Sequence, residues 1–312
     1  MRLLAALVPV LAALSLLAAS TGVVRDWQRF PPVVRMDAAG EIYAVGDVHG
    51  DYDRLVALLA GAGILGGIPA SPEAPRWSAG NAVLVFTGDM IDKGPKALSV
   101  LALLRALQDA AAPAGGRVVV LMGNHEAEFL AQTSVAADRD FEGQLSAARL
   151  RPAEVAACGG DVGRFLCSLP FAARIGPWFF SHAGNTDGRT LDRLAADLRN
   201  GVDRDGFATA QLVGGNSILE ARIGAKGPRG RSWFEAGAPR IDAARLLSGF
   251  ADTLQAGHIV EGHHHGETQF PDGAVRRLGE MYQWRGRLFL IDTGMSRGVG
   301  RRRHRVIKQS ST

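Results

Sequence analysis

Five short clusters of acidic, asparagine and histidine residues occur along the chain, and each follows a short apolar run. They are Asp47-Val48-His49, Asp89-Met90-Ile91-Asp92, Asn124-His125-Glu126, His182-Ala183-Gly184 and His263-His264-His265. Carboxylate, amide and imidazole donors without a thiolate suit Mn, Fe or Zn in a reactive site better than a structural zinc site. This many donors exceed the needs of one metal. Two metals that share a carboxylate are the usual arrangement for phosphate ester hydrolysis.

Each cluster by itself is weak support for a metal site. An isolated Asp-x-His or a single histidine is common, and the histidine then packs in the core or lies on the surface. The sequence GNHE at 123–126 is moderately specific. The clusters together, in this order and each after an apolar run, predict one metal site.

The elements that must position these clusters can be predicted from residue patterns. Short runs rich in Val, Ile and Phe indicate strands at 42–45, 82–87, 117–122, 178–181, 258–261 and 288–291. Helical spacing of apolar residues indicates helices at 52–62, 96–112, 127–151 and 191–198. This alternation is typical of an α/β layered fold. In such folds ligands bind at the carboxyl ends of the strands, so the clusters should converge on one crevice.

The clusters also form a recognisable set of motifs: GDVHG (46–50), GDMIDKG (88–94), GNHE (123–126), HAG (182–184) and GH (262–263). In these motifs the chain resembles the calcineurin-like metallophosphoesterases, and within them the phosphoprotein phosphatase (PPP) type. The segment IDTGMS (291–296) resembles the closing strand of the bacterial branch that includes Shewanella-like phosphatases. The resemblance covers roughly residues 41–297 and implies a four-layer α/β/β/α sandwich.

The resemblance implies a set of ligands for two metals, either divalent or trivalent. The set comprises Asp47 and His49 for the first metal, Asp89 as the bridge, and Asn124, His182 and His263 for the second. The wider superfamily often has Gly-His-x-His, in which both outer histidines bind metal. Strand-like alternation would point His263 and His265 to the same side, which makes His265 a further ligand and His264 a bystander.

The resemblance also implies how catalysis would proceed. His125 would be the general acid that protonates the leaving oxygen, oriented by Asp92, while a hydroxide bridging the metals attacks phosphorus in line. The family usually has Arg where this chain has Lys93, and Lys binds phosphate as a point charge rather than a fork. A further phosphate-binding Arg is expected before the last histidines, either Arg222 or Arg231.

The function expected from these residues is phosphomonoester hydrolysis with two metals. A protein serine/threonine or tyrosine phosphatase is the leading prediction, so the partner is a phosphorylated protein. A small phosphoester or a dinucleotide polyphosphate is the alternative substrate. A protein that binds metal or a phosphorylated ligand without turnover is a third alternative, which the full set of ligands and the His125–Asp92 pair make less favourable.

The N-terminus has the order of a secretory signal peptide: Met1-Arg2, an apolar run over 3–19, then Ala18-Ala19-Ser20. An uncleaved membrane anchor is the alternative and the only membrane contact expected. We therefore expect a periplasmic or secreted protein. The predicted organisation is a signal peptide 1–20, a linker 21–40, a metallophosphoesterase domain 41–297 with cap-like insertions at 126–176 and 199–256, and a basic C-terminal tail 298–312.

Composition adds few constraints. The chain has 312 residues, and its 35 Lys and Arg against 31 Asp and Glu give a net charge of +4, too mild to indicate a nucleic-acid partner. Its two cysteines, Cys158 and Cys167, lie outside the clusters. In an oxidising compartment they could form a local disulfide, and two buried thiols are the alternative.

Overall fold

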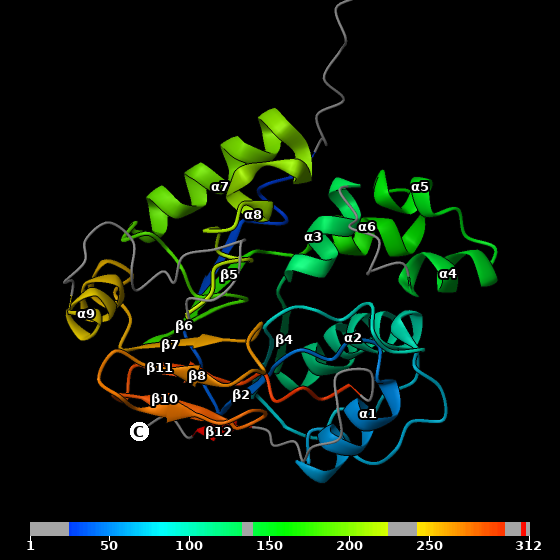
Figure 1. The fold of residues 1–312 in the computed structure, drawn as a ribbon. Coiled ribbons are helices and arrows are strands. Elements are labelled where there is room, and N and C mark those ends of the chain that lie inside the picture. Colours follow the sequence, from blue (N-terminus) through cyan, green and yellow to red (C-terminus); the bar gives the residue numbers. More distant parts are fainter. Residues whose placement is uncertain (1–24, 133–139, 224–241, 297–306, 310–312) are drawn as a thin grey trace, which may run out of the picture.

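The computed structural model describes residues 25–132, 140–223, 242–296 and 307–309. Two β-sheets lie at its centre, with helices on their outer sides (Figure 1). This arrangement confirms the predicted α/β fold with central sheets and flanking helices. The predicted signal peptide 1–20 and the candidate phosphate ligand Arg231 lie outside the described residues.

The smaller sheet carries the first three polar clusters. Its strand order is β12-β2-β3-β4, with β2 at Ile42–Val45, β3 at Val83–Phe86, β4 at Arg117–Val120 and β12 at Ile307–Gln309. Strands β2, β3 and β4 are parallel, and β12 pairs antiparallel with β2 at the edge. The segment predicted as a basic tail, 298–312, thus contributes an edge strand.

The larger sheet carries the remaining clusters. Its order is β1-β5-β6-β7-β11-β10, with β1 at Val33–Met36, β5 at Ala172–Ile175, β6 at Trp178–Ser181, β7 at His258–Glu261, β10 at Tyr282–Trp284 and β11 at Leu288–Leu290. Strands β6, β7 and β11 are parallel to one another. A short hairpin of β8 at Thr268–Gln269 and β9 at Val275–Arg276 lies between β7 and β10 in the chain.

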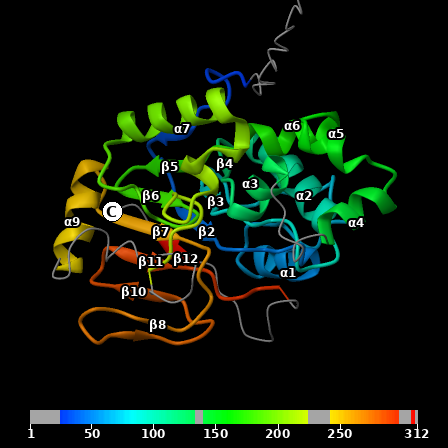
Figure 2. The ribbon, with the colours of Figure 1, turned by 45° about the horizontal axis from the view of Figure 1, so that its top comes forward.

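The two sheets face each other across an apolar core. Strands of both sheets contribute buried side chains to it, among them Val83, Val85, Val119, Phe180 and Val260. The opposite faces of the sheets are covered by helices, which gives the four layers (Figures 1 and 2). These helices are α1 at Tyr52–Gly61 and α2 at Ala97–Ala111 beside the smaller sheet, and α7 at Leu191–Asp205 and α9 at Ala243–Thr253 beside the larger one.

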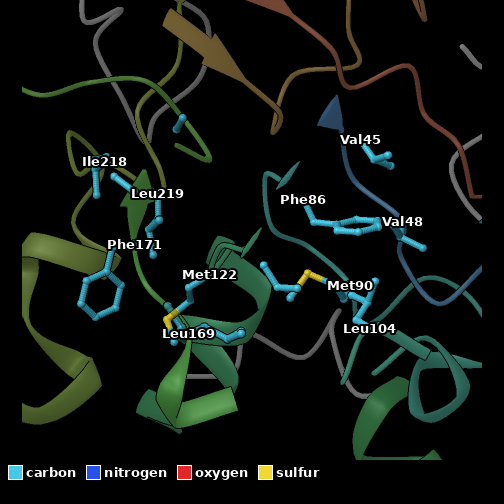
Figure 3. Packing of buried hydrophobic residues seen from close by; sticks show 14 of the residues in the cluster. Val45, Val48, Phe86, Met90, Leu104, Met122, Leu169, Phe171, Ile218 and Leu219 are labelled. Carbon is cyan, nitrogen blue, oxygen red and sulfur yellow. The ribbon is translucent and has the colours of Figure 1, made fainter. Parts of the chain in front are cut away.

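Apolar residues inside the polar clusters anchor the loops of the site. Val48 stands between Asp47 and His49, and Met90 follows Asp89; both apolar side chains are wholly buried in the main core cluster (Figure 3). Burying such a side chain contributes about 1.5–3 kcal/mol. The core therefore holds each loop by one residue while the neighbouring polar residues face the site.

The predicted helix 127–151 differs from the observed structure. Helix α3 spans Asn124–Ala131 and ends at Gln132, whose backbone is left-handed (φ 53°), and a separate helix α4 spans Asp140–Ala147. Two further helices follow, α5 at Pro152–Ala156 and α6 at Gly160–Ser168. Helices α3 to α6 lie together at one end of the sandwich (Figure 1). A disulfide between Cys158 and Cys167 joins α6 to the turn after α5.

Two segments predicted as peripheral contribute strands to the larger sheet. The expected insertion 126–176 ends in β5, and the expected linker 21–40 contains β1, which pairs parallel with β5. The other expected insertion, 199–256, includes the end of α7, the short helix α8 at Ala210–Val213 and α9. Among the described elements of the first insertion, α4, α5 and α6 stand apart from the sheets (Figure 1).

Candidate active site

The carboxyl ends of the parallel strands bring the predicted ligands to the seam between the two sheets. His182, after β6, approaches the end of β3 through its Nδ1, which lies 2.8 Å from the carbonyl oxygen of Thr87. The backbone N–H of His263, after β7, donates to Asp47 Oδ1 at 3.0 Å. A Cβ on Gly262 would lie 2.3 Å from that oxygen, so this approach requires glycine. Residues far apart in the sequence therefore meet in one site.

Two sets of three donors in this site are close enough to hold a metal ion, and both include Asp89. One set is Asp47, Asp89 and His182, and the other is His49, Asp89 and His125; within each set one donor atom per residue lies within 4.8 Å of the others. Asp89 thus occupies the position of a shared carboxylate. Asn124 joins the first set, because its Oδ1 lies 3.0 Å from His182 Nε2.

The residues present fit two metal ions. His263 Nε2 is buried and has no hydrogen-bond partner among the described residues, although its ring centre lies 4.9 Å from that of His182. An unpaired buried nitrogen is costly unless a ligand satisfies it. The predicted ligands are all buried and offer only oxygen and imidazole donors: Asp47, His49, Asp89, Asn124, His182 and His263. Such donors suit Mn, Fe or Zn.

Burial and neighbouring charges shift the pKa values of the buried donors. Burial and the nearby Asp292 raise the pKa of Asp47 well above its ordinary value, and burial lowers the pKa of His49 to about 3. Burial alone would lower the pKa of His182, but Asp89 and Asp47 outweigh it and raise the value to about 10. Bound cations would relieve the crowding of carboxylates, because positive charge stabilises their ionised forms.

Several site residues have a backbone that ordinary residues rarely adopt. His49, Asp89 and His263 have φ of 44°, 54° and 60°. Such conformations cost about 1–3 kcal/mol each and persist only where surrounding contacts impose them. The site thus depends on groups that hold its loops in place.

Glu126 is one such group, and sequence reasoning gave it no role. Its carboxylate is fully buried and accepts the backbone N–H groups of Asp89, Met90, Ile91 and Gly123 at 2.8–3.1 Å. It therefore ties the loop after β3 to the start of α3. The one feature of the sequence that pointed to Glu126 is its position as the last residue of the motif GNHE.

The predicted acid and its orienting carboxylate form a direct pair. His125 Nδ1 lies 2.9 Å from Asp92 Oδ2, and both side chains are buried. Burial alone would lower the pKa of His125, but Asp89 and the bond to Asp92 raise it to about 9. The backbone N–H of His125 also donates to Asp89 Oδ1 at 3.1 Å. These contacts hold the His125 ring beside Asp89, the carboxylate common to both sets of donors.

The candidate phosphate-binding residues are placed differently from one another. Lys93 lies in the site, with Nζ 3.0 Å from His49 Nε2. Arg222 is exposed, and its charge helps to lower the pKa values of His263 and His264 after the larger effect of burial. Arg222 therefore borders the last cluster.

The other two histidines of the last cluster face different surroundings. His265 is 39% exposed, and its Nδ1 lies 3.4 Å from the buried Asp292 carboxylate. It belongs to neither set of three donors found among the described residues. His264 is buried, and its Nδ1 has no hydrogen-bond partner among those residues. The role of His265 as a ligand stays a prediction.

Known proteins resemble this chain to different extents. A Shewanella-like protein phosphatase 2 of Arabidopsis thaliana is 25% identical over 312 aligned residues, 85% of this chain and 73% of that protein. A symmetrical bis(5'-nucleosyl)-tetraphosphatase of Cronobacter sakazakii is 36% identical over 89 residues, 28% of this chain. This match, like that to a further curated relative, spans only 24% of the relative's length.

A solved structure shares the fold over most of the chain. It is a cold-active protein-tyrosine phosphatase of a psychrophilic Shewanella species, with a TM-score of 0.63 at 22% identity. The likeness covers 89% of this chain and 77% of that one. Because the identity is low, it supports the architecture alone.

The family match covers the whole site. Residues 40–267 match the calcineurin-like phosphoesterases, and this range includes all five polar clusters. Members of that family bind two metal ions, in keeping with the two sets of donors that share Asp89. The chain is therefore a member of the calcineurin-like phosphoesterase family, a metallophosphoesterase with Shewanella-like protein phosphatase relatives over most of its length.

Proposed function

We propose that this chain is a two-metal phosphomonoesterase that acts on phosphorylated serine, threonine or tyrosine side chains of proteins. The observation that carries the proposal is the His125–Asp92 pair, held at 2.9 Å beside the carboxylate that both sets of donors share. A binding protein without turnover would have no need for an imidazole oriented by a carboxylate at this position. The Arabidopsis relative, named as a protein phosphatase, supports a protein substrate.

The proposed metal ions are Mn, Fe or Zn. Asp47, His49, Asp89, Asn124, His182 and His263 would hold them, and Asp89 is the carboxylate that both sets of donors share. When bound, they would supply the positive charge that binds phosphoryl oxygens and the acidity that makes water a nucleophile at neutral pH.

The chain's own residues would perform the remaining steps. Lys93 lies next to His49 and would bind a phosphoryl oxygen as a point charge, with Arg222 or Arg231 as a second cation. His125, protonated and oriented by Asp92, would pass the proton on its Nε2 to the leaving oxygen as the ester bond breaks. The product alcohol then leaves neutral, which lowers the barrier for serine and threonine esters most.

A dinucleotide polyphosphate is the second candidate substrate. The local match to the Cronobacter sakazakii tetraphosphatase, 36% identical over 89 residues, supports it. The two substrates demand different access, because a folded phosphoprotein cannot enter a closed cap. Helix α4 contacts the site through Phe141, whose backbone N–H donates to Asp92, and with the adjoining α5 and α6 it is the candidate for such a cap.

A substrate panel on the purified mature protein separates these functions. Phosphoserine, phosphothreonine and phosphotyrosine peptides should be compared with diadenosine tetraphosphate, each with Mn, Fe or Zn supplied. We expect kcat/KM to be highest for a phosphopeptide. A higher kcat/KM for the dinucleotide would make it the substrate in place of a phosphoprotein. Absence of turnover with every metal would refute the proposal that this chain is an enzyme.

We also propose that the protein works outside the cytoplasm, in the periplasm or as a secreted enzyme. The signal-peptide pattern of residues 1–20 supports export. The Cys158–Cys167 disulfide supports it independently, because such bonds persist mainly in oxidising compartments. Fractionation of the native host, with N-terminal sequencing of the protein recovered, tests both export and cleavage.

A further inference from the structure

The loop that carries Asp92 has a constrained backbone. Asp92 and Lys93 both have left-handed conformations, with φ of 62° and 56°. The N–H of Gly94 donates back to the carbonyl of Asp92 at 2.6 Å, which closes a three-residue turn. A Cβ on Gly94 would lie 2.1 Å from the carbonyl oxygen of His49. Consecutive left-handed residues do not persist without outside contacts, so other parts of the chain must hold this turn.

Helix α4 supplies contacts on both sides of the turn. Gln144 donates from Nε2 to the carbonyl of Gly94 at 2.9 Å and accepts the N–H of Ala97 through Oε1 at 2.7 Å. Ala97 is the first residue of α2, and its N–H has no partner within that helix. One amide side chain therefore bridges the end of the catalytic turn and the start of the helix that follows it.

The same helix binds the catalytic carboxylate directly. The backbone N–H of Phe141, in the first turn of α4, donates to Asp92 Oδ1 at 3.1 Å, while Asp92 Oδ2 faces His125 at 2.9 Å. Asp92 thus caps α4 with one oxygen and orients the imidazole with the other. A helix N-terminus favours negative charge at such a position.

Aromatic packing fixes α4 against the helix that carries His125. The Phe141 ring is fully buried and meets Phe129 of α3 edge to face, with ring centres 5.0 Å apart. Such pairs add about 0.5–1.5 kcal/mol beyond the area they bury. The orientation of α4 is therefore coupled to α3 and to the Asp92 turn at once.

We propose that α4 is the positioning element of the acid catalyst, with Gln144 as its key positioning residue: the helix sets the orientation of Asp92, and through it that of His125. This inference rests on the proposed phosphatase function. The side-chain hydrogen bonds of Gln144 are to the backbone of Gly94 and Ala97, so its effect would pass through the turn.

The leaving group of the substrate provides the test. Dinitrophenolate departs without a proton, whereas phenolate needs the acid, so misplacing His125 should slow phenyl phosphate selectively. We expect Gln144→Ala to lower the single-turnover rate on phenyl phosphate by roughly 10-fold or more relative to dinitrophenyl phosphate. Gln144→Glu keeps an acceptor for the Ala97 N–H but loses the donor to the Gly94 carbonyl. It should also slow phenyl phosphate more than dinitrophenyl phosphate, but by a smaller factor than Gln144→Ala.

The matched control is Gln108→Ala on α2, whose Nε2 donates to the carbonyl of Val118 at 3.2 Å, in a contact outside the turn. It should leave both rates unchanged. Equal slowing of the two esters by Gln144→Ala, or no slowing of either, would overturn the proposal. Failure of the wild-type protein to cleave either ester with metal supplied would instead refute the proposed function itself.

Discussion

His182 Nε2 lies 3.0 Å from Asn124 Oδ1, although the two residues follow strands of different sheets. The same nitrogen lies 3.3 Å from Asp89 Oδ1. Three donors from three loops thus meet at the seam of the sandwich. The site exists only when the two sheets are packed together, so metal binding and folding of the sandwich should be coupled.

Replacing His125 with asparagine should separate acid catalysis from metal binding. We expect His125→Asn to lower kcat by about 10²–10⁴-fold. Metal content, measured by elemental analysis, should stay at the wild-type level, because the described contact of His125 Nδ1 is with Asp92. Loss of metal in this variant would show that His125 is a metal ligand, a role that its presence in one of the donor sets allows.

In the metal-free protein, the pKa of His125 should be raised and that of His49 lowered from the ordinary histidine value. The pKa of His125, raised to about 9, predicts a charged ring at pH 7, whereas the pKa of His49, lowered to about 3, predicts a neutral one. Protonation of His125 therefore stabilises the fold below its ordinary pKa of about 6.5, and this contribution is lost as the pH rises to about 9. His49 is neutral in the folded protein, so its contribution to the free energy of unfolding is lost as the pH falls from about 6.5 towards 3.

Histidine-ring NMR of the metal-free protein would measure these values. Asp92→Asn should lower the pKa of His125, since one of the two carboxylates that raise it is then neutral. A His125 that titrates at or below pH 6.5 in the otherwise unchanged protein would contradict the assignment of Asp92 as its partner.

Lys93 should contribute to phosphate binding through its charge. Lys93→Ala is expected to raise KM for a phosphate ester by roughly 10-fold or more, the usual effect of losing a charged hydrogen bond. Lys96→Ala is the matched control, because its exposed ammonium pairs with Asp53 at 2.8 Å. Lys93→Arg keeps the positive charge and should raise KM less than Lys93→Ala does. An unchanged KM in Lys93→Ala would count against Lys93 as a phosphate contact.

The disulfide should stabilise α6 and the turn that precedes it. Cys158 and Cys167 are 9 positions apart, so the chain-entropy estimate gives about 2–3 kcal/mol for closing the loop. The double variant Cys158→Ser/Cys167→Ser should therefore unfold at lower urea concentration than the wild type. Reductant should shift the wild-type midpoint and leave the double variant unchanged; equal midpoints without reductant would refute a stabilising role.

The strands next to the site could be predicted because their signals are local. The apolar runs at 42–45, 178–181 and 258–261 end at polar clusters, and β2, β6 and β7 have those bounds. Strand β5 carries no such signal: its sequence, AARI, is a strand because it pairs with β1, far away in the chain. Pairing at that distance cannot be inferred from residue patterns.

The site divides in the same way. The candidate ligands follow from residue types within short motifs, and the structure brings Asp47, Asp89 and His182 within reach of one another. The groups that hold the loops could not be predicted, because Glu126 and Gln144 act through backbone contacts that exist only after folding. Helix α3 ends at a left-handed Gln132, a position where glycine is the usual signal for a helix end. Because neither Gly nor Pro marks this end, residue patterns predicted one continuous helix.

Metal content measured together with turnover tests the central claim most directly. The wild-type protein, loaded with Mn, Fe or Zn, should bind two ions per chain and hydrolyse a chromogenic phosphate ester, and chelation should abolish the activity. Because Asp89 belongs to both donor sets, Asp89→Asn should lose both ions and the activity, whereas the exposed Asp53→Asn should keep them. Full metal content and turnover in Asp89→Asn would contradict a shared carboxylate at the centre of the site.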